Sequence, residues 1–155
     1  MQNCPLAIEV VGHIKVTNEK TGAVLADQSN MEVDAMFELL IRGLIGEDRV
    51  ARIHAVFSGG KPLTRGLRTL GSPVLNVPVE TGGDLAPLKS QDQRGIRSIG
   101  TWTALLKPTG SVTYDTLGLV SSTGLLCAAS ALQSEITLES GDVIAVQWTI
   151  SLRGN

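Results

Sequence analysis

The chain has 155 residues, a length that suits one domain with a single hydrophobic core, so we treat residues 1–155 as one domain. Its apolar share of 43% is too high for a disordered protein, and only 18% of its residues are charged. The net charge of −2 disfavours partners that bind a basic surface, such as nucleic acid or anionic lipid. Mean hydropathy is +0.17, which with so few charges indicates burial against partner molecules.

The sequence shows no signal for export or for a membrane. No apolar run reaches the roughly 20 residues that a membrane-spanning helix needs. The first residues, Met1–Pro5, lack a basic region followed by an apolar stretch. Cys4 and Cys127 are far apart and match no metal-binding spacing. We therefore expect folding in a cytoplasm with both thiols reduced, while a pairing between the two cysteines or between subunits stays an alternative.

The first third of the chain begins with a predicted β-hairpin. Apolar and polar residues alternate over 8–17, a pattern that is typical of a half-buried strand. Residues 18–22 favour a turn because Asn and Gly tolerate positive φ, and a short strand over 23–26 follows.

A helix is predicted over about residues 30–45. Ser29 and Glu32 have the spacing of a capping box, in which each side chain bonds a free amide at the start of a helix. Gly46 predicts the end of the helix in the left-handed conformation. The apolar stripe of the segment is formed by Met36, Phe37, Leu39, Leu40, Ile41 and Leu44. A stripe of this width favours packing of the helix on a sheet.

A strand predicted over 50–57, with Phe57 on its apolar face, leads into a long segment without a regular pattern. Glycine and proline recur through residues 58–95, and a loop of this length is unusual inside a compact domain. The segment is either a functional arm or a set of short edge strands, of which residues 74–79 are the best candidate.

The leucines and arginines of this segment are the candidate interface residues. Scattered leucines argue against free disorder, because apolar side chains need a surface to bury against, and a neighbouring subunit would provide one. The arginines could form salt bridges between subunits or contact packaged nucleic acid, and solvation of the loop is an equal alternative. The predicted interface consists of Leu63, Arg65, Leu67, Arg68, Leu70, Leu75, Leu85, Leu88 and Arg94. Deletion of residues 62–92 is then expected to leave the rest of the chain folded but to abolish assembly.

The last third of the chain is rich in predicted strands. They cover residues 96–106, 112–120, 125–131 and 142–152. A tight turn at 121–124 joins the second and third of them into a hairpin. The last strand alternates most clearly and places Trp148 on its apolar face, so we expect Trp148 in the core.

Together these elements predict a mainly β fold, either a β-sandwich or an open barrel. It carries one α-helix over about 30–45 and a long irregular loop over about 58–95.

Few residues could carry catalysis. His13 and His54 both fall on polar faces of predicted strands and match no metal-ligand spacing, so we interpret them as surface histidines. Residues Ser58–Lys61 are similar to a phosphate-binding loop, but they lack the first glycine and the final Ser or Thr of that motif. We therefore expect no metal and no cofactor.

Four acidic residues of the C-terminal half are candidates for hydrolysis by paired carboxylates. They are Asp115, Glu135, Glu139 and Asp142. A solvated turn accounts for Glu139 and Asp142, and a hydrogen bond from backbone amides is the simpler explanation of Asp115. The aromatic share of 3% is low for a site that binds carbohydrate or single-stranded nucleic acid. The sequence therefore indicates a protein that is not an enzyme.

Four stretches of the chain carry a resemblance to a known family. They are Asn30–Leu40; Ile53–Gly60; Tyr114–Val120 with Gly124–Ala128; and Gly141–Ile150. This order resembles the small structural proteins of tailed-bacteriophage particles, which often have a helix, a strand ending in Gly-x-Gly, an acidic hairpin and a final strand with a tryptophan. The resemblance covers most of the chain outside about 61–94. The chain departs from the pattern in its hairpin, Asp-Thr-Leu-Gly, and in its longer middle loop.

The resemblance implies a structural subunit of the neck, collar, tail or baseplate, which packs symmetrically with copies of itself and with other virion proteins. The implied location is the virion, after synthesis in the cytoplasm of the bacterial host. Neither a membrane nor a specific nucleic-acid sequence is expected as a partner. Three alternatives stay open: a capsid decoration protein, a receptor- or carbohydrate-binding β-sandwich module, and a small hydrolase that uses Asp115 with a glutamate.

Overall fold

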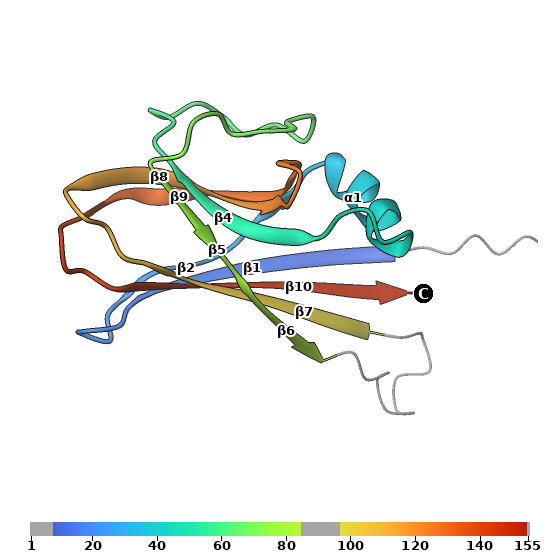
Figure 1. Cartoon of the computed structure of the whole chain (residues 1–155), viewed down its shortest axis with the longest axis horizontal. Coiled ribbons are helices and arrows are strands. Elements are labelled where there is room, and N and C mark those ends of the chain that lie inside the picture. Colours follow the sequence, from blue (N-terminus) through green and yellow to red (C-terminus); the bar gives the residue numbers. More distant parts are fainter. Residues whose placement is uncertain (1–7, 85–96, 155) are drawn as a thin grey trace, which may run out of the picture.

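The computed structural model describes residues 8–84 and 97–154, which form two antiparallel sheets and one short helix (Figure 1). The strands are β1 (Ile8–Asn18), β2 (Val24–Ser29), β3 (Met31–Glu32), β4 (Val50–Val56), β5 (Leu75–Pro78), β6 (Glu80–Asp84), β7 (Arg97–Leu106), β8 (Val112–Ser121), β9 (Leu126–Leu138) and β10 (Ile144–Gly154). Sheet A has the order β2-β1-β10-β7-β6, and sheet B has the order β3-β9-β8-β4-β5. The predicted mainly β fold is confirmed, and the two sheets are those of a β-sandwich.

Sheet A supplies one wall of the core through its central strands. β10 pairs along its length with β1 on one side and with β7 on the other. The predicted inward face of β10 is confirmed, since Trp148 has 0% exposure and Ile150 has 4%. Trp148 stands directly opposite Trp102 of β7, so the two indoles lie on the same face of the sheet.

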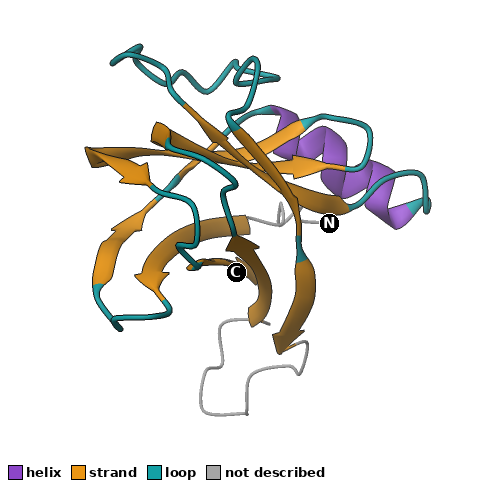
Figure 2. Cartoon of the chain, turned by 60° about the vertical axis from the view of Figure 1, so that its left-hand side comes forward, coloured by secondary structure: helices purple, strands orange, loops and turns teal. Residues whose placement is uncertain are grey.

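Sheet B is covered on both of its faces. Residues 116–121 of β8 and 126–130 of β9 are buried without interruption. Sheet A covers one face, while the helix α1 (Ala35–Leu44) and residues 61–74 lie on the other side (Figure 2). Strands that are covered on both faces carry continuous apolar runs rather than alternation. This explains why Leu117–Val120 has no period of two.

Two edge strands turn the corners between the sheets. β2 of sheet A continues through Asn30 into β3 of sheet B, and β5 of sheet B continues through Val79 into β6 of sheet A. Strands that bend in this way serve as an edge in each of the two sheets. The corners therefore hold Asn30 and Val79 at opposite rims of the core.

The start of the helix differs from the prediction. The helix begins at Ala35 rather than near residue 30, and the expected capping box is wrong because Ser29 ends β2 and Glu32 lies in β3. The segment is extended since it carries the chain across the corner, where β3 pairs with β9. Pairing with a neighbouring strand has here overridden a local helix signal.

The end of the helix is as predicted. Gly46 has a φ of 77°, which is the left-handed conformation that glycine adopts without strain. The amide of Gly46 donates to the carbonyl of Gly43, and the amide of Glu47 donates to the carbonyl of Arg42 at 2.8 Å. These two bonds form a Schellman motif and satisfy carbonyls that the helix leaves free.

Three strand limits also differ from the prediction. β4 ends at Val56, and Phe57 is 51% exposed rather than part of the apolar face. β2 runs to Ser29 instead of residue 26, and β9 runs to Leu138 instead of residue 131. The last part of β9 is mostly exposed on a twisted ladder with a bulge, so it has little apolar pattern.

Candidate functional site

The described part of the predicted arm, residues 58–84, folds onto the chain's own sheets. It contains β5 and β6, so the second alternative, short edge strands, applies to this part. The predicted interface leucines Leu63, Leu67, Leu70 and Leu75 each lie partly buried against the hydrophobic core. Their apolar character is therefore accounted for within the chain.

The two described arginines of the predicted interface tie this segment to the helix. The guanidinium of Arg68 lies 2.6 Å from the carboxylate of Glu38. The backbone carbonyl of Arg68 accepts a hydrogen bond from the amide of Leu126. The carbonyl of Arg65 accepts from the amide of Asp34 at 2.7 Å. Both arginines therefore have contacts within the chain. The other predicted interface residues, Leu85, Leu88 and Arg94, lie outside the described residues.

These contacts argue against the expectation that residues 62–92 could be removed while the rest of the chain stays folded. The deletion would take away β5 and β6, which pair with β4 and β7. It would also uncover Gly118 on the outer face of sheet B, where the side chain of Leu70 packs. A test of assembly therefore needs point substitutions.

The outer face of α1 carries the most exposed apolar cluster of the described residues. We call this cluster the α1 ridge, and it consists of Phe37, Ile41, Leu44 and Ile45. Their exposed fractions are 51%, 60%, 84% and 62%, respectively. Single exposed apolar residues are ordinary, but three on one helix face, with the C-cap Ile45 beside them, form a candidate contact surface.

The α1 ridge is a second apolar face, separate from the one that α1 buries against the sandwich. The helix buries Ala35, Met36 and Leu39. With about 100° between successive helix residues, the four residues of the α1 ridge span an arc of about 100° on the other side. Only Glu38 and Arg42, which form an ion pair at 3.2 Å, interrupt the apolar surface around the helix. The sequence predicted the apolar stripe but could not separate its two faces.

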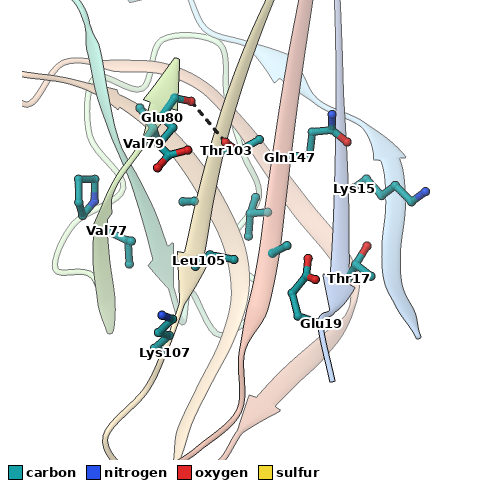
Figure 3. A pocket seen from close by; sticks show the side chains of 14 residues that line it. Lys15, Thr17, Glu19, Val77, Val79, Glu80, Thr103, Leu105, Lys107 and Gln147 are labelled. Carbon is teal, nitrogen blue, oxygen red and sulfur yellow. Dashed lines mark hydrogen bonds between the residues drawn. The ribbon is translucent and has the colours of Figure 1, made fainter. Parts of the chain in front are cut away.

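A groove of about 690 Å³ crosses the outer face of sheet A (Figure 3). Its floor is a row of side chains from neighbouring strands, Lys15, Gln147 and Thr103, and Glu80 of β6 ends the row. β5 contributes Val77 to one wall. None of its described lining residues is aromatic, so the groove lacks the flat ring surface on which sugars commonly stack.

The two histidines lie in different sheets and do not form a joint site. His13 of β1 is exposed and pairs with the carboxylate of Asp27 on β2. His54 of β4 is half-buried, and burial followed by the positive charge of Arg52 lowers its pKa. This keeps His54 neutral at pH 7. No group of three or more potential metal ligands occurs among the described residues.

Asp115 holds the loop that follows β4. Its carboxylate accepts hydrogen bonds from the amides of Ser58 at 2.7 Å, Gly59 at 3.1 Å and Gly60 at 3.4 Å. Burial alone would raise the pKa of Asp115, but these bonds and one from Thr116 outweigh it and lower the pKa. The prediction of a hydrogen bond to backbone amides is confirmed.

The same contacts explain why Ser58–Lys61 is similar to a phosphate loop. Gly59 and Gly60 have φ values of 68° and 85°, and consecutive amides in such a turn form a nest that binds an anion. The chain's own carboxylate, Asp115, occupies the nest. The loop after β4 is thus bound to β8, the neighbouring strand that supplies the anion through Asp115.

Asp48 is a buried polar residue that the sequence analysis did not identify. It is 7% exposed, and its carboxylate accepts hydrogen bonds from the hydroxyls of Ser122 at 2.6 Å and Thr123 at 2.5 Å. It also accepts from the amide of Arg49. Burial by itself would raise the pKa of Asp48, but these donors hold it well below the usual range. An aspartate before a strand and a Ser-Ser-Thr turn were the available signals, and neither is specific.

The remaining candidates lie in a turn, in β9 or outside the described residues. Asp142 accepts a hydrogen bond from the amide of Glu139 at 2.8 Å, which confirms that both belong to a turn. Glu135 lies in the exposed part of β9. Cys127 is buried in β9, and burial raises the pKa of its thiol to about 12. Cys4 lies outside the described residues.

No protein-family model matches the chain, and comparisons with curated proteins and with solved structures give no match either. Among the described residues, no helix combines the length and the apolar character that a membrane crossing requires.

Proposed function

We propose that the chain is a non-enzymatic structural subunit of a bacteriophage particle. It packs with copies of itself and with other virion proteins in the neck, collar, tail or baseplate region. The observation that carries the assembly part of this proposal is the α1 ridge. A helix that is apolar around nearly its whole circumference is stable when both of its sides are covered, and the chain covers one.

The size of the α1 ridge supports a role in association. A fully exposed side chain of this type presents roughly 150–200 Å², so the four exposed fractions amount to on the order of 400 Å². Burial of this area corresponds to on the order of 10 kcal/mol per copy, before the entropy of association is subtracted. This gain is comparable with the roughly 4–15 kcal/mol that association costs, so assembly also requires a partner whose surface fits.

The virion part of the proposal rests on the phage resemblance, and the four stretches that carry it meet in space. Asn30 of the first stretch accepts a hydrogen bond from Trp148 of the last at 2.9 Å. Asp115 of the third stretch binds the amides of Ser58 and Gly59 of the second. The residues that carry the resemblance are thus framework residues, as expected for proteins that share an architecture and act through their surfaces.

The assembly part is tested with two matched substitutions, Phe37→Asp and Phe57→Asp. Both phenylalanines are 51% exposed, but only Phe37 belongs to the α1 ridge. We expect the wild type to form a discrete oligomer in sedimentation velocity. Phe37→Asp should raise the dissociation constant of this oligomer at least tenfold, whereas Phe57→Asp should leave it unchanged. A wild type that stays monomeric at high micromolar concentration would contradict the proposal.

The virion part is tested by mass spectrometry of phage particles that are released from cells carrying the gene and purified by density. Recovery of the chain in a fixed ratio to the major particle proteins supports the proposal. Recovery of the chain only from the soluble fraction of the cells would overturn it.

A further inference from the structure

We infer that the α1 ridge is the centre of a two-fold symmetric contact with a second copy of this chain, in which the two α1 helices pack antiparallel. The inference rests on the proposed function, since it names the partner of the same surface. It follows from the spacing of the ridge, from its area and from the charges beside it.

Three of the four residues of the α1 ridge are spaced symmetrically about one of them. Ile41 lies at its centre, and Phe37 and Ile45 stand four residues before and after it. Residues at intervals of four form one of the ridges by which helices pack into the grooves of other helices. A two-fold axis at Ile41 brings each Phe37 next to Ile45 of the second copy. Phe37, Ile41 and Ile45 are therefore complementary to their own copies, as a two-fold contact requires, while Leu44 lies level with Glu38 of the second copy.

The area of the α1 ridge fits a dimer interface. A stable interface of standard size covers about 800 Å² on each partner, with an apolar centre and a polar rim. The ridge supplies on the order of 400 Å² of apolar centre. Glu38, Arg42 and Arg68 lie beside it and supply polar groups for a rim.

The charges beside the ridge favour the antiparallel orientation. Glu38 and Arg42 lie on the same flank of α1, one helical turn apart. At a rise of 1.5 Å per residue, a two-fold axis at Ile41 places Glu38 about 3 Å along the axis from Arg42 of the second copy and about 9 Å from its Glu38. In a two-fold parallel arrangement the two charged flanks would lie on opposite sides of the contact, so Glu38 and Arg42 would not meet the charges of the second copy.

The test uses disulfide formation, because a residue on a two-fold axis meets its own copy. In a Cys4→Ser background, where the remaining Cys127 is buried, Ile41→Cys is oxidised in the full-length chain. The matched control is Leu105→Cys, on the outer face of sheet A and 47% exposed. We expect dimers to form at least tenfold faster through position 41 than through position 105, with unchanged unfolding midpoints for both variants.

A second arm fixes the orientation. Chains carrying Phe37→Cys and Ile45→Cys, one of them isotope-labelled, are mixed and oxidised. Antiparallel packing predicts that mixed dimers exceed both self-linked dimers by at least fivefold. An excess of self-linked dimers at each position would indicate parallel helices and would overturn the inference.

The outcomes separate this inference from the proposed function. If the wild type is oligomeric but position 41 links no faster than position 105, the ridge makes an asymmetric contact, so the inference fails while the assembly proposal stands. If the wild type is monomeric and binds vesicles of phosphatidylcholine and phosphatidylglycerol in a Phe37-dependent way, the ridge binds lipid. That result overturns both the inference and the assembly proposal.

Discussion

The indole Nε1 of Trp148 donates a 2.9 Å hydrogen bond to the side-chain oxygen of Asn30, across a separation of 118 residues in sequence. Trp148 has no exposed surface, so this donor has no access to water. Asn30 sits at the corner between β2 and β3, and its side chain fills the space above Gly12. One polar contact thus joins the final strand of sheet A to the chain segment that crosses into sheet B.

Asn30→Ala should destabilise the fold by about 1–3 kcal/mol, because it leaves a buried indole donor without a partner. Urea unfolding followed by tryptophan fluorescence measures the change. The matched control is Asn76→Ala, an exposed asparagine whose side-chain oxygen accepts a hydrogen bond from Arg52 at the surface, for which we expect a change within about 0.5 kcal/mol. Equal changes for the two variants would show that the buried bond contributes little.

Gly12→Ala should also destabilise the fold, by about 1–3 kcal/mol, because a Cβ at this position would collide with the carboxamide of Asn30. The effect should shrink by at least about 1 kcal/mol in an Asn30→Ala background, where the carboxamide is absent. Gly110→Ala is the control, since a Cβ there meets no atom within 4 Å. Additive effects of Gly12→Ala and Asn30→Ala would contradict the proposed collision.

Asp48→Asn should lower the free energy of unfolding at pH 7 and should make this free energy less sensitive to acid pH. The folded pKa of Asp48 is depressed below its unfolded value of about 3.9. The carboxylate therefore contributes its full stability above pH of about 4, and this contribution is lost as the pH falls toward the folded pKa. Urea unfolding at pH 7 and pH 3 should show the wild-type advantage narrowing at the lower pH.

The control for the acid experiment is Asp34→Asn, an aspartate whose side chain is 66% exposed. We expect the free energy of unfolding of Asp34→Asn to equal that of the wild type at pH 7 and at pH 3. An advantage of wild type over Asp48→Asn that stays constant from pH 7 to pH 3 would rule out the ionised carboxylate as the source of stability.

Asp115→Ala should release the loop after β4, because the amides of Ser58, Gly59 and Gly60 lose their shared acceptor. Hydrogen exchange of these amides should accelerate at least tenfold, with a stability loss of about 2 kcal/mol. Asp115→Asn keeps one acceptor oxygen and should give an intermediate effect. Unchanged exchange in the alanine variant would show that the loop holds its shape without the carboxylate.

Several elements followed from local patterns in the sequence. β10 alternates because one of its faces is buried, and the hairpins at residues 18–22 and 121–124 follow from turn residues. The helix end at Gly46 follows from the conformational freedom of glycine. The backbone role of Asp115 was also predictable, because a carboxylate beside an apolar strand needs donors and an amide supplies them.

Other elements depended on contacts that are distant in the sequence. The Ser29–Glu32 capping box failed because β3 pairs with β9, and a strand partner can override a local preference. Asp48 escaped notice because its donors, Ser122 and Thr123, lie more than seventy residues away. The leucines of residues 61–74 predicted burial against a neighbouring subunit. In the structure they pack instead against the core of the same chain, and Leu70 lies over Gly118 of sheet B.

By itself, the sequence determined that the chain is mainly β, with hairpins and one helix, because alternation and turns are local properties of the backbone and its neighbouring side chains. Only the tertiary structure decided which apolar residues stay exposed. The stripe of α1 reads as one continuous surface in sequence, and packing against β9 covers one side and leaves Phe37, Ile41, Leu44 and Ile45 outside. Exposure depends on where distant segments pack, and a local pattern does not contain that information.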